Sequence, residues 1–173
     1  MDFIAKIYYN TFKVINMERG TMNNTIKEVL NKLLVQLFND ILHIEEKSIK
    51  NTEFADLSIT EIHTIEAIGT EGDKTMGEIA HDLRITVGTL TTAINRLIKK
   101  GYVERKRIEE DRRVVLVNLT DTGKAVFDLH SVFHEEMIDE IIENFDESEL
   151  EVLTKALGKA TRFFEKKYKS LQK

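Results

Sequence analysis

The 173-residue sequence contains no cysteine and no proline. Without cysteine the chain has no disulfide framework, no thiolate nucleophile and no thiol redox sensor. Without proline, long helices are not interrupted. No segment approaches the roughly 18 apolar residues that a membrane span needs, and Lys6 and Lys13 break the apolar N-terminal stretch that a signal peptide would require. The sequence therefore predicts a cytoplasmic protein with no membrane partner.

The net charge of −5 is unevenly distributed along the chain. Residues 84–113 carry nine basic and four acidic side chains, whereas the rest of the chain carries 16 basic and 26 acidic ones. A polyanion would be attracted to the first region and repelled by the second. This asymmetry predicts a nucleic-acid-binding segment on an acidic body.

Hydrophobic periodicity predicts a mainly helical protein with one small β-hairpin. Apolar residues recur at three- and four-residue spacing over residues 25–50, which predicts a long helix. Capping patterns at Ser58, Thr75, Thr86, Thr120 and Asp146 predict the starts of five further helices. Gly69 and Gly101 are predicted to end two of them. Two β-prone segments, residues 102–107 and 113–119, flank a polar hairpin tip at residues 108–112.

Two short helices separated by a tight turn at Arg84 predict a helix-turn-helix. In its second helix Leu90, Ile94 and Leu97 point inward, which leaves a polar outer face for DNA. Hydroxyls, an amide and a guanidinium can read base edges, and lysines near the helix end suit phosphates. The candidate DNA-binding residues of this helix are Thr86, Gly88, Thr89, Thr91, Thr92, Asn95, Arg96, Lys99 and Lys100. The alternative is an ordinary solvated helix face.

The hairpin that follows favours the DNA interpretation. A basic two-stranded ribbon can reach a minor groove or the phosphate backbone, and Asp111 can pair with Arg113 and orient it. The candidate DNA-binding residues of the ribbon are Arg105, Lys106, Arg107, Asp111, Arg112 and Arg113. The alternative is a set of surface ion pairs of little energetic value.

These motifs resemble the MarR family of bacterial regulators. The resemblance lies in Asp111-Arg-Arg113, the apolar strand that follows it, Leu119-Thr120 with Gly123, and the junction Leu97–Arg105. It covers the chain from about residue 26 and implies a winged helix-turn-helix over 58–119. It also implies a homodimer whose interleaved helices come from 22–57 and 120–173, bound to double-stranded DNA at a pseudo-palindromic operator. Residues 1–21 lie outside the resemblance and are predicted to be an N-terminal extension. The codons for Glu18-Arg19-Gly20 form a purine-rich run typical of a ribosome-binding site, which predicts that translation starts at Met22.

Four stretches are more specifically similar to the fatty-acid-synthesis repressors of streptococci. They are Ser58–Ile65, Gly88–Thr92, Glu110–Val115 and the pair Leu129-His130 with His134. This resemblance implies a repressor of membrane-lipid synthesis genes whose DNA binding is strengthened by acylated acyl carrier protein. A MarR-type regulator that responds to another small molecule is an alternative.

A zinc-responsive regulator is a further alternative. His130 and His134 stand four residues apart on a predicted helix, so both imidazoles share one face and can chelate one ion. Zinc-responsive members of the same family use residues that correspond to Glu45, His63, His130 and His134. The alternative to metal binding is that these histidines are polar residues at a dimer interface or in an effector pocket. No other cofactor is expected.

Two other classes of function compete with DNA binding. The sequence has no phosphate-binding loop and no nucleophile-elbow pattern, and its carboxylates are scattered over amphipathic helices, so we expect no enzymatic activity. A winged helix that contacts only proteins would not need the excess of basic residues in 84–113.

Overall fold

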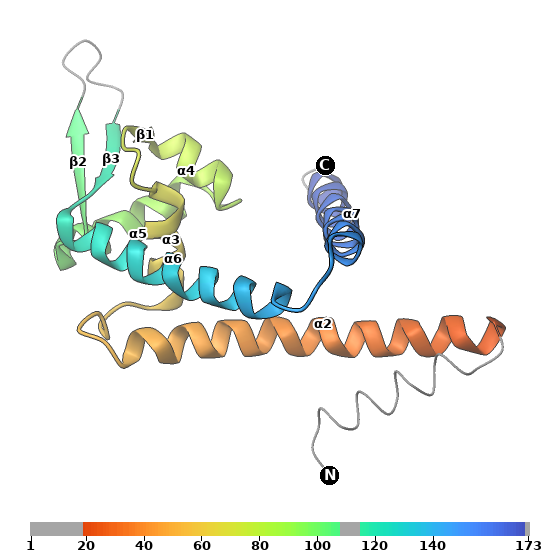
Figure 1. Ribbon diagram of the computed structural model, residues 1–173. Coiled ribbons are helices and arrows are strands. Elements are labelled where there is room, and N and C mark those ends of the chain that lie inside the picture. The colour runs from red at the N-terminus through yellow and green to blue at the C-terminus, as the bar shows by residue number, and fades with distance from the viewer. Residues whose placement is uncertain (1–18, 108–114, 172–173) are drawn as a thin grey trace. The chain divides into compact units, whose positions relative to one another are not determined.

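The computed structural model describes residues 19–107 and 115–171, and its described side chains lie in 25–106 and 115–171. It divides the chain into two compact units, residues 1–126 and 127–173. The helices and strands follow in the order α2 (Arg19–Lys50), α3 (Ile59–Ile68), β1 (Lys74–Thr75), α4 (Met76–Asp82), α5 (Val87–Lys100), β2 (Val103–Arg107), β3 (Val115–Leu119), α6 (Asp121–Ile142) and α7 (Glu147–Leu171) (Figure 1).

Helix α2 extends the helix predicted over residues 25–50, since it begins at Arg19. Its C-terminal turn is closed by short-range hydrogen bonds. The amide of Thr52 donates to the carbonyl of Ile49 at 3.0 Å, and the hydroxyl of Thr52 donates to the same carbonyl at 2.7 Å. These bonds satisfy a carbonyl that the end of a helix leaves without an intrahelical partner. The chain then turns into the segment that leads to α3.

The predicted helix caps in the first unit are confirmed. Ser58 and Glu61 form a capping box at the start of α3, and Thr75 and Glu78 form a second one at the start of α4. The hydroxyl of Thr86 accepts a 3.1 Å hydrogen bond from the amide of Thr89 and caps α5. Each capping side chain satisfies a backbone N–H group that the first helical turn leaves open. Local sequence therefore defines where these three helices begin.

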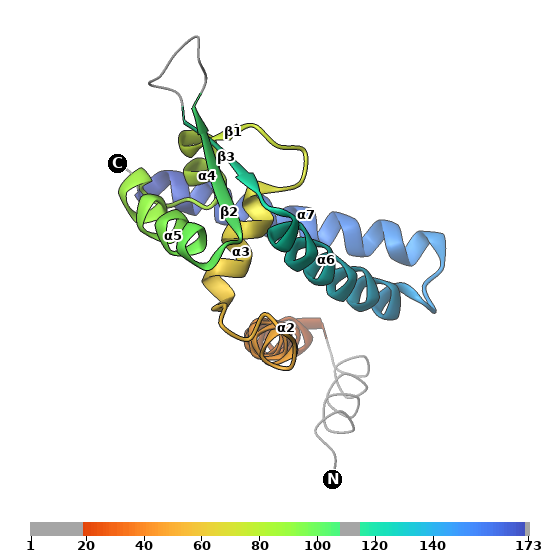
Figure 2. The ribbon, with the colours of Figure 1, turned by 90° about the vertical axis from the view of Figure 1, so that its left-hand side faces the viewer.

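The sheet has three strands rather than the two that the sequence predicted. Its order is β1-β3-β2, and both pairings are antiparallel. Val103 pairs with Leu119 and Arg107 with Val115, while Lys74 of β1 pairs with Val117. Figures 1 and 2 show β3 between the other two strands. Strand β1 is only two residues long, so it carries no alternating pattern that sequence could reveal. The predicted hairpin tip lies outside the described residues.

The core of the first unit is built from aliphatic residues of helices α3, α4, α5 and α6, of strand β3 and of the segment before α3. Full burial of one such side chain stabilises the fold by about 1.5–3 kcal/mol. The side chains with the least exposure are Leu57, Ile62, Ile65, Ile68, Ile79, Leu90, Ile94, Leu97, Val117 and Val126. The core therefore fixes α5 from beneath, on the face opposite its polar residues.

The start of α6 packs against the turn that follows α5. The hydroxyl of Thr120 donates to the carbonyl of Gly101 at 2.7 Å and accepts a 3.1 Å bond from the amide of Gly123. The amide of Thr120 donates to the carbonyl of Tyr102 at 3.1 Å. A β-carbon at Gly123 would overlap that carbonyl oxygen, so only glycine fits here. The predicted cap at Thr120 is confirmed, and its glycine has a steric reason.

The second unit consists of the rest of α6 and helix α7. Helix α6 ends at Ile142. Asp146 and Glu149 form the predicted capping box of α7, with hydrogen bonds of 2.9 and 3.0 Å. None of the residues of α7 is buried. Among the described residues, no helix combines the length and the apolar character that crossing a bilayer requires.

Candidate nucleic-acid interface

Helix α5 is held by its inner face and by both of its ends. Leu90, Ile94 and Leu97 are each 0% exposed, as their helical spacing predicted. Before the helix, Arg84 adopts a left-handed backbone conformation with φ of 55°. After it, Gly101 has φ of 85°, a conformation that glycine adopts without steric cost. Core packing therefore holds the inner face of α5, and its polar outer face takes no part in that packing.

The outer face of α5 presents the predicted polar side chains to solvent. Thr89, Thr92, Asn95, Arg96 and Lys99 are exposed. The amide of Asn95 and the guanidinium of Arg96 are the groups with several donors, which can make bidentate contacts with base edges. This arrangement can read a groove of DNA without displacing the core.

The threonines of α5 share their hydroxyls with the helix itself. The hydroxyls of Thr86 and Thr89 lie 2.9 Å apart, and that of Thr91, which is half-buried, donates to the carbonyl of Val87 at 2.7 Å. A β-carbon at Gly88 would meet only the hydroxyl oxygen of Thr86, at 3.7 Å, so nothing within the chain demands glycine there. The predicted contact between Gly88 and DNA stays a prediction.

Strand β2 follows α5 and carries further basic residues. Arg105 and Lys106 are exposed, and the backbone of Arg107 pairs with Val115. Asp111, Arg112 and Arg113 lie outside the described residues, so the predicted pair between Asp111 and Arg113 stays a prediction. The described part of the ribbon places two cations on one strand.

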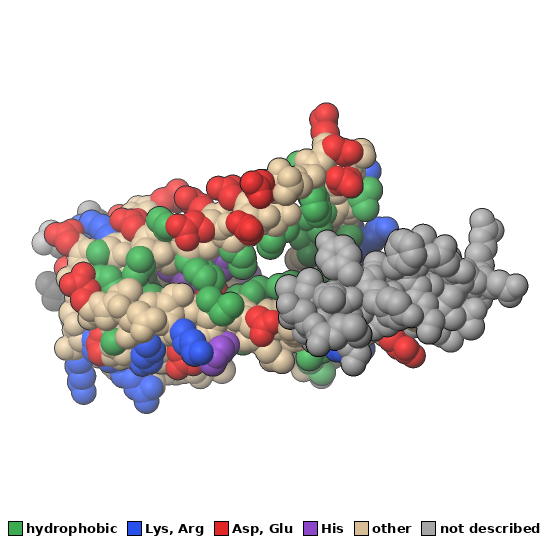
Figure 3. Space-filling model, turned by 60° about the horizontal axis from the view of Figure 1, so that its bottom comes forward, with side chains coloured by type: hydrophobic (Ala, Val, Ile, Leu, Met, Phe, Trp, Pro, Cys, Tyr) green, Lys and Arg blue, Asp and Glu red, His purple; other side chains and the backbone are tan. Residues whose placement is uncertain are grey.

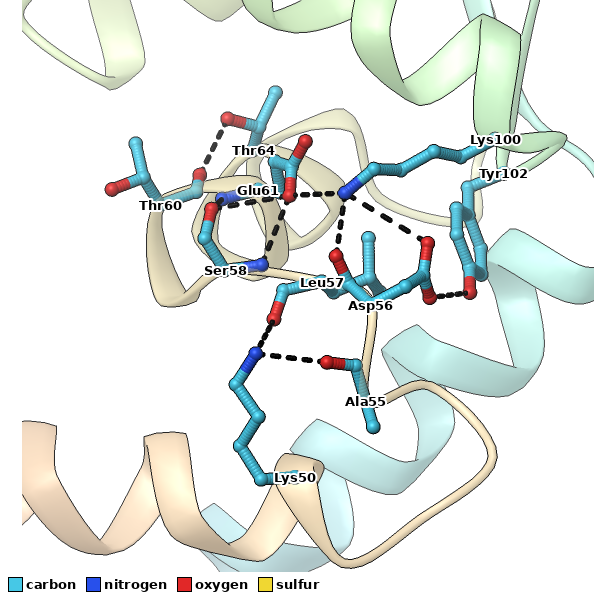
Figure 4. Close-up of polar contacts among 10 residues, drawn as sticks. All are labelled: Lys50, Ala55, Asp56, Leu57, Ser58, Thr60, Glu61, Thr64, Lys100 and Tyr102. Carbon is cyan, nitrogen blue, oxygen red and sulfur yellow. Dashed lines mark hydrogen bonds and ion pairs between the residues drawn. The ribbon is translucent and has the colours of Figure 1, made fainter.

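Lys100 differs from the other predicted DNA ligands because its ammonium contacts the protein. Its Nζ donates to Oε2 of Glu61 at 2.8 Å and to the carbonyl of Asp56 at 2.6 Å (Figure 4). Burial would raise the pKa of Glu61, but the hydrogen bonds from Lys100 and Ser58 outweigh it, so the pKa lies below its ordinary value. The sequence could not indicate this partner, because Glu61 and Lys100 are 39 residues apart and no spacing rule connects them.

Tyr102 is a second residue that sequence reasoning missed. Its side chain is buried, its ring lies edge-on to that of Phe54 at 6.2 Å, and its hydroxyl donates to Oδ1 of Asp56 at 2.7 Å. Burial, then the hydrogen bond and negative charge of Asp56, raise the pKa of Tyr102 to about 12. Asp56 and Tyr102 are 46 residues apart in the sequence, so only the fold brings them together.

The predicted zinc ligands form two pairs, one in each unit. In the first unit, Oε2 of Glu45 and Nε2 of His63 are 3.3 Å apart. In the second, the Nε2 atoms of His130 and His134 are 3.1 Å apart and their rings meet edge to face. Imidazole nitrogens and a carboxylate oxygen are the donors that zinc prefers. Each pair fits chelation, whereas the joint action of all four residues stays a prediction.

Known proteins with similar sequences and structures are transcriptional regulators. The MarR family model matches residues 57–115. The chain is 32% identical over 114 residues to the HTH-type transcriptional regulator YcgE of Bacillus subtilis, and the match covers 65% of this chain and 73% of YcgE.

Two solved structures of complexes with DNA are also similar. Streptococcus pneumoniae FabT, solved in complex with DNA, has a TM-score of 0.77 and 41% identity, and the match covers 81% of this chain and 98% of FabT. A mutant of MarR from E. coli, solved in complex with operator DNA, has a TM-score of 0.59 and 25% identity, covering 76% and 92% of the two chains. The combination of a winged helix, its sequence motifs and these relatives shows that the chain belongs to the MarR family of transcriptional regulators.

Proposed function

We propose that the chain binds double-stranded DNA through the outer face of α5 and the basic strand β2. The observation that carries the proposal is the contrast between the two faces of α5. Its inner face is fully buried, while its outer face presents Asn95, Arg96 and Lys99 to solvent. The similarity to FabT and MarR, both solved in complex with DNA, supports DNA binding by this chain. Asn95 and Arg96 would contact base edges, and Lys99 and Arg105 would contact phosphates.

We propose further that the DNA-binding species is a homodimer. Helix α2 leaves a row of large apolar side chains open, including Leu34, Leu37 and Phe38, which are 46%, 50% and 58% exposed. Figure 3 shows hydrophobic side chains open at the surface among charged ones. An extended apolar surface of this kind marks an interaction site. A second copy would cover it and place two α5 helices in successive major grooves, roughly 34 Å apart.

The genes under control would be those of fatty-acid and membrane-lipid synthesis. The 41% identity to FabT over nearly its whole length supports this assignment, together with the matching stretches around Ser58, Gly88 and Leu129. The effector would be acylated acyl carrier protein, which would strengthen DNA binding and close a feedback loop on lipid synthesis. Such control requires that the effector bind one of two conformations more tightly than the other.

The proposed DNA contacts can be tested by substitution. Replacing Arg96 by alanine should cost about 1–3 kcal/mol of discrimination at one base pair of the selected site. Replacing Lys99 by methionine should weaken binding to all sequences alike. Binding is measured by fluorescence anisotropy on the duplex that the wild-type chain enriches from a random library. Unchanged affinity and selectivity of both variants would exclude the outer face of α5.

The regulatory role needs a separate experiment. Duplexes that carry the promoters of lipid-synthesis genes are titrated with the full chain, alone or with acylated or unacylated acyl carrier protein. We expect the acylated form alone to tighten binding. Tight binding of the selected duplex but not of these promoters would keep DNA binding and reject the lipid role.

A zinc-responsive regulator is the second candidate function, because each of the two histidine-containing pairs can chelate an ion. Zinc supplied to the metal-free chain should then change DNA affinity, and a chelator should reverse the change. Zinc uptake is measured by competition with a chromogenic chelator, with His134→Ala and His43→Ala as test and control. Equal zinc uptake by the two variants would reject a role for His134.

A further inference from the structure

The ammonium of Lys100, in the last turn of α5, binds oxygen atoms of two residues near the start of α3. It contacts Oε2 of Glu61 at 2.8 Å, the carbonyl of Asp56 at 2.6 Å and Oδ2 of Asp56 at 3.8 Å. An ammonium has three hydrogens to donate, and short bonds to two protein oxygens use most of that capacity. Its side chain is 29% exposed, while that of Glu61 is only 9% exposed. Lys100 therefore neutralises a nearly buried carboxylate.

The same carboxylate holds the start of α3. Oε2 of Glu61 accepts hydrogen bonds from the amide of Ser58 at 2.9 Å and from its hydroxyl at 3.1 Å. One oxygen atom thus joins the first turn of α3 to the last turn of α5. A charge-assisted bond of this kind is about twice as strong as a neutral one. Removing Lys100 would leave the carboxylate without its cation.

Asp56 binds both residues that flank Gly101 in the turn after α5. Its carboxylate accepts the hydroxyl of Tyr102 at 2.7 Å, and its carbonyl accepts Lys100 (Figure 4). Lys100 and Tyr102 flank Gly101, the left-handed residue that ends α5. The turn from α5 into the wing is therefore held at both of its ends by one residue of the segment between α2 and α3.

The segment around Asp56 is in turn bound to the end of α2. Nζ of Lys50 donates to the carbonyl of Ala55 at 2.8 Å and to that of Leu57 at 3.4 Å. Residues 55–57 thus lie between a lysine that ends α2 and a lysine that ends α5 (Figure 4). These bonds connect the end of α2 to the end of α5.

We infer that Lys100 is a positioning residue rather than a DNA ligand. Asp56, Glu61, Lys100 and Tyr102 form a turn clamp, which sets the angle between α5 and β2 and the position of both relative to α3. This inference rests on the proposed DNA binding. It gives Lys100, whose ammonium binds Glu61 and Asp56, a role different from the phosphate contact proposed for Lys99, its neighbour in sequence. Small errors in the placement of a recognition element are costly, because several contacts are lost together.

Salt dependence separates the two roles. Each lost phosphate contact reduces the slope of log affinity against log salt by about 0.9. A positioning residue makes no such contact, so its loss weakens binding to the selected duplex with nearly the same slope. Merely lower stability would leave the affinity of the folded protein and its preference for the selected duplex over an unselected one unchanged.

The experiment compares four variants of the full chain with the wild type on both duplexes at several salt concentrations, at a temperature where circular dichroism shows each to be folded. Lys100→Met should weaken binding to the selected duplex about tenfold, which corresponds to the loss of one charge-assisted hydrogen bond. Binding to the unselected duplex should change less. Lys100→Arg should restore affinity, Glu61→Gln should resemble Lys100→Met, and Lys99→Met should flatten the salt slope.

The possible outcomes separate the inference from the proposed function. If Lys100→Met flattens the slope as Lys99→Met does, Lys100 is a phosphate ligand and the inference is wrong. Full affinity of both Lys100→Met and Glu61→Gln would also overturn it. If the wild type itself binds no duplex, the proposed function fails first. Should Lys100→Met not fold, Tyr102→Phe takes its place, because it removes only the hydroxyl that binds Asp56 and must weaken binding to the selected duplex selectively.

Discussion

Helices α5 and α7 are both amphipathic, but they use their apolar sides differently. In α5 Leu90, Ile94 and Leu97 are buried in the core of the first unit, and its polar side is open. In α7 none of the residues is buried, and Val152, Leu157 and Phe163 are 67%, 56% and 54% exposed. Helix α5 is therefore complete within one chain, whereas α7 has apolar surface left for a partner. One helix is built to present a polar face and the other to be covered.

The largest effect should follow from truncating the buried side of α5. Leu97→Ala should lower the free energy of unfolding by about 2–5 kcal/mol at every protein concentration, because it leaves a cavity in the core. Leu157→Ala in α7 should instead weaken the proposed homodimer, so its unfolding midpoint should depend more strongly on concentration. Urea unfolding at two concentrations measures both. Equal, concentration-independent losses would erase the distinction between the two helices.

Glycines provide the second contrast. Gly123→Ala should destabilise the chain by about 1–3 kcal/mol, because the new β-carbon overlaps the carbonyl of Tyr102. Gly158→Ala in α7 meets only a flexible arginine end at 3.6 Å, and it should stabilise the helix by up to about 1 kcal/mol. Thermal unfolding of the two variants is the measurement. A stabilising Gly123→Ala would show that α6 does not pack closely on Tyr102.

Lowering the pH should destabilise the chain through Glu61, whose carboxylate binds Lys100 at the end of α5. Its folded pKa lies below the ordinary value of 4.5, so the folded chain binds fewer protons than the unfolded one at acidic pH. The stabilisation is complete above that value and is lost as the pH falls through the lower folded pKa. The stability difference between wild type and Glu61→Gln should shrink over this window in urea unfolding at graded pH. A difference that grows toward acid would contradict the ion pair with Lys100.

The smallest effect is spectroscopic. One tyrosine should ionise at about pH 12, two units above the ordinary value, because the hydroxyl of Tyr102 is buried against Asp56. Absorbance of the phenolate during alkaline titration follows it, provided that the chain remains folded. Tyr102→Phe should remove this late phase of the titration and leave the earlier phases. If Tyr102 ionises together with the other tyrosines, its hydroxyl does not bind Asp56 as the structure shows.

Much of the fold could be predicted from local signals. The caps at Ser58, Thr75, Thr86 and Asp146 act within one helical turn, so sequence alone locates them. The inward side of α5 followed from the spacing of its apolar residues. Strand β1 escaped prediction because its two residues become a strand only by pairing with β3.

The candidate site was only partly predictable for the same reason. Exposure of Asn95, Arg96 and Lys99 follows from helical periodicity. The partner of Lys100 is 39 residues away in sequence, and that of Tyr102 is 46 residues away. No spacing rule connects them, since the contact depends on where the segment after α2 passes. Sequence therefore indicated which residues are basic and on the outer side of α5, and the fold showed that the ammonium of Lys100 binds within the protein.

The salt dependence of DNA binding by the wild-type chain tests the central claim most directly. Affinity for the selected duplex is measured from low to high salt in a single buffer. The account predicts a linear fall of log affinity with log salt, with a slope of about 0.9 for each phosphate contacted by α5 and the wing. Absence of salt-sensitive binding to every duplex tested would contradict it.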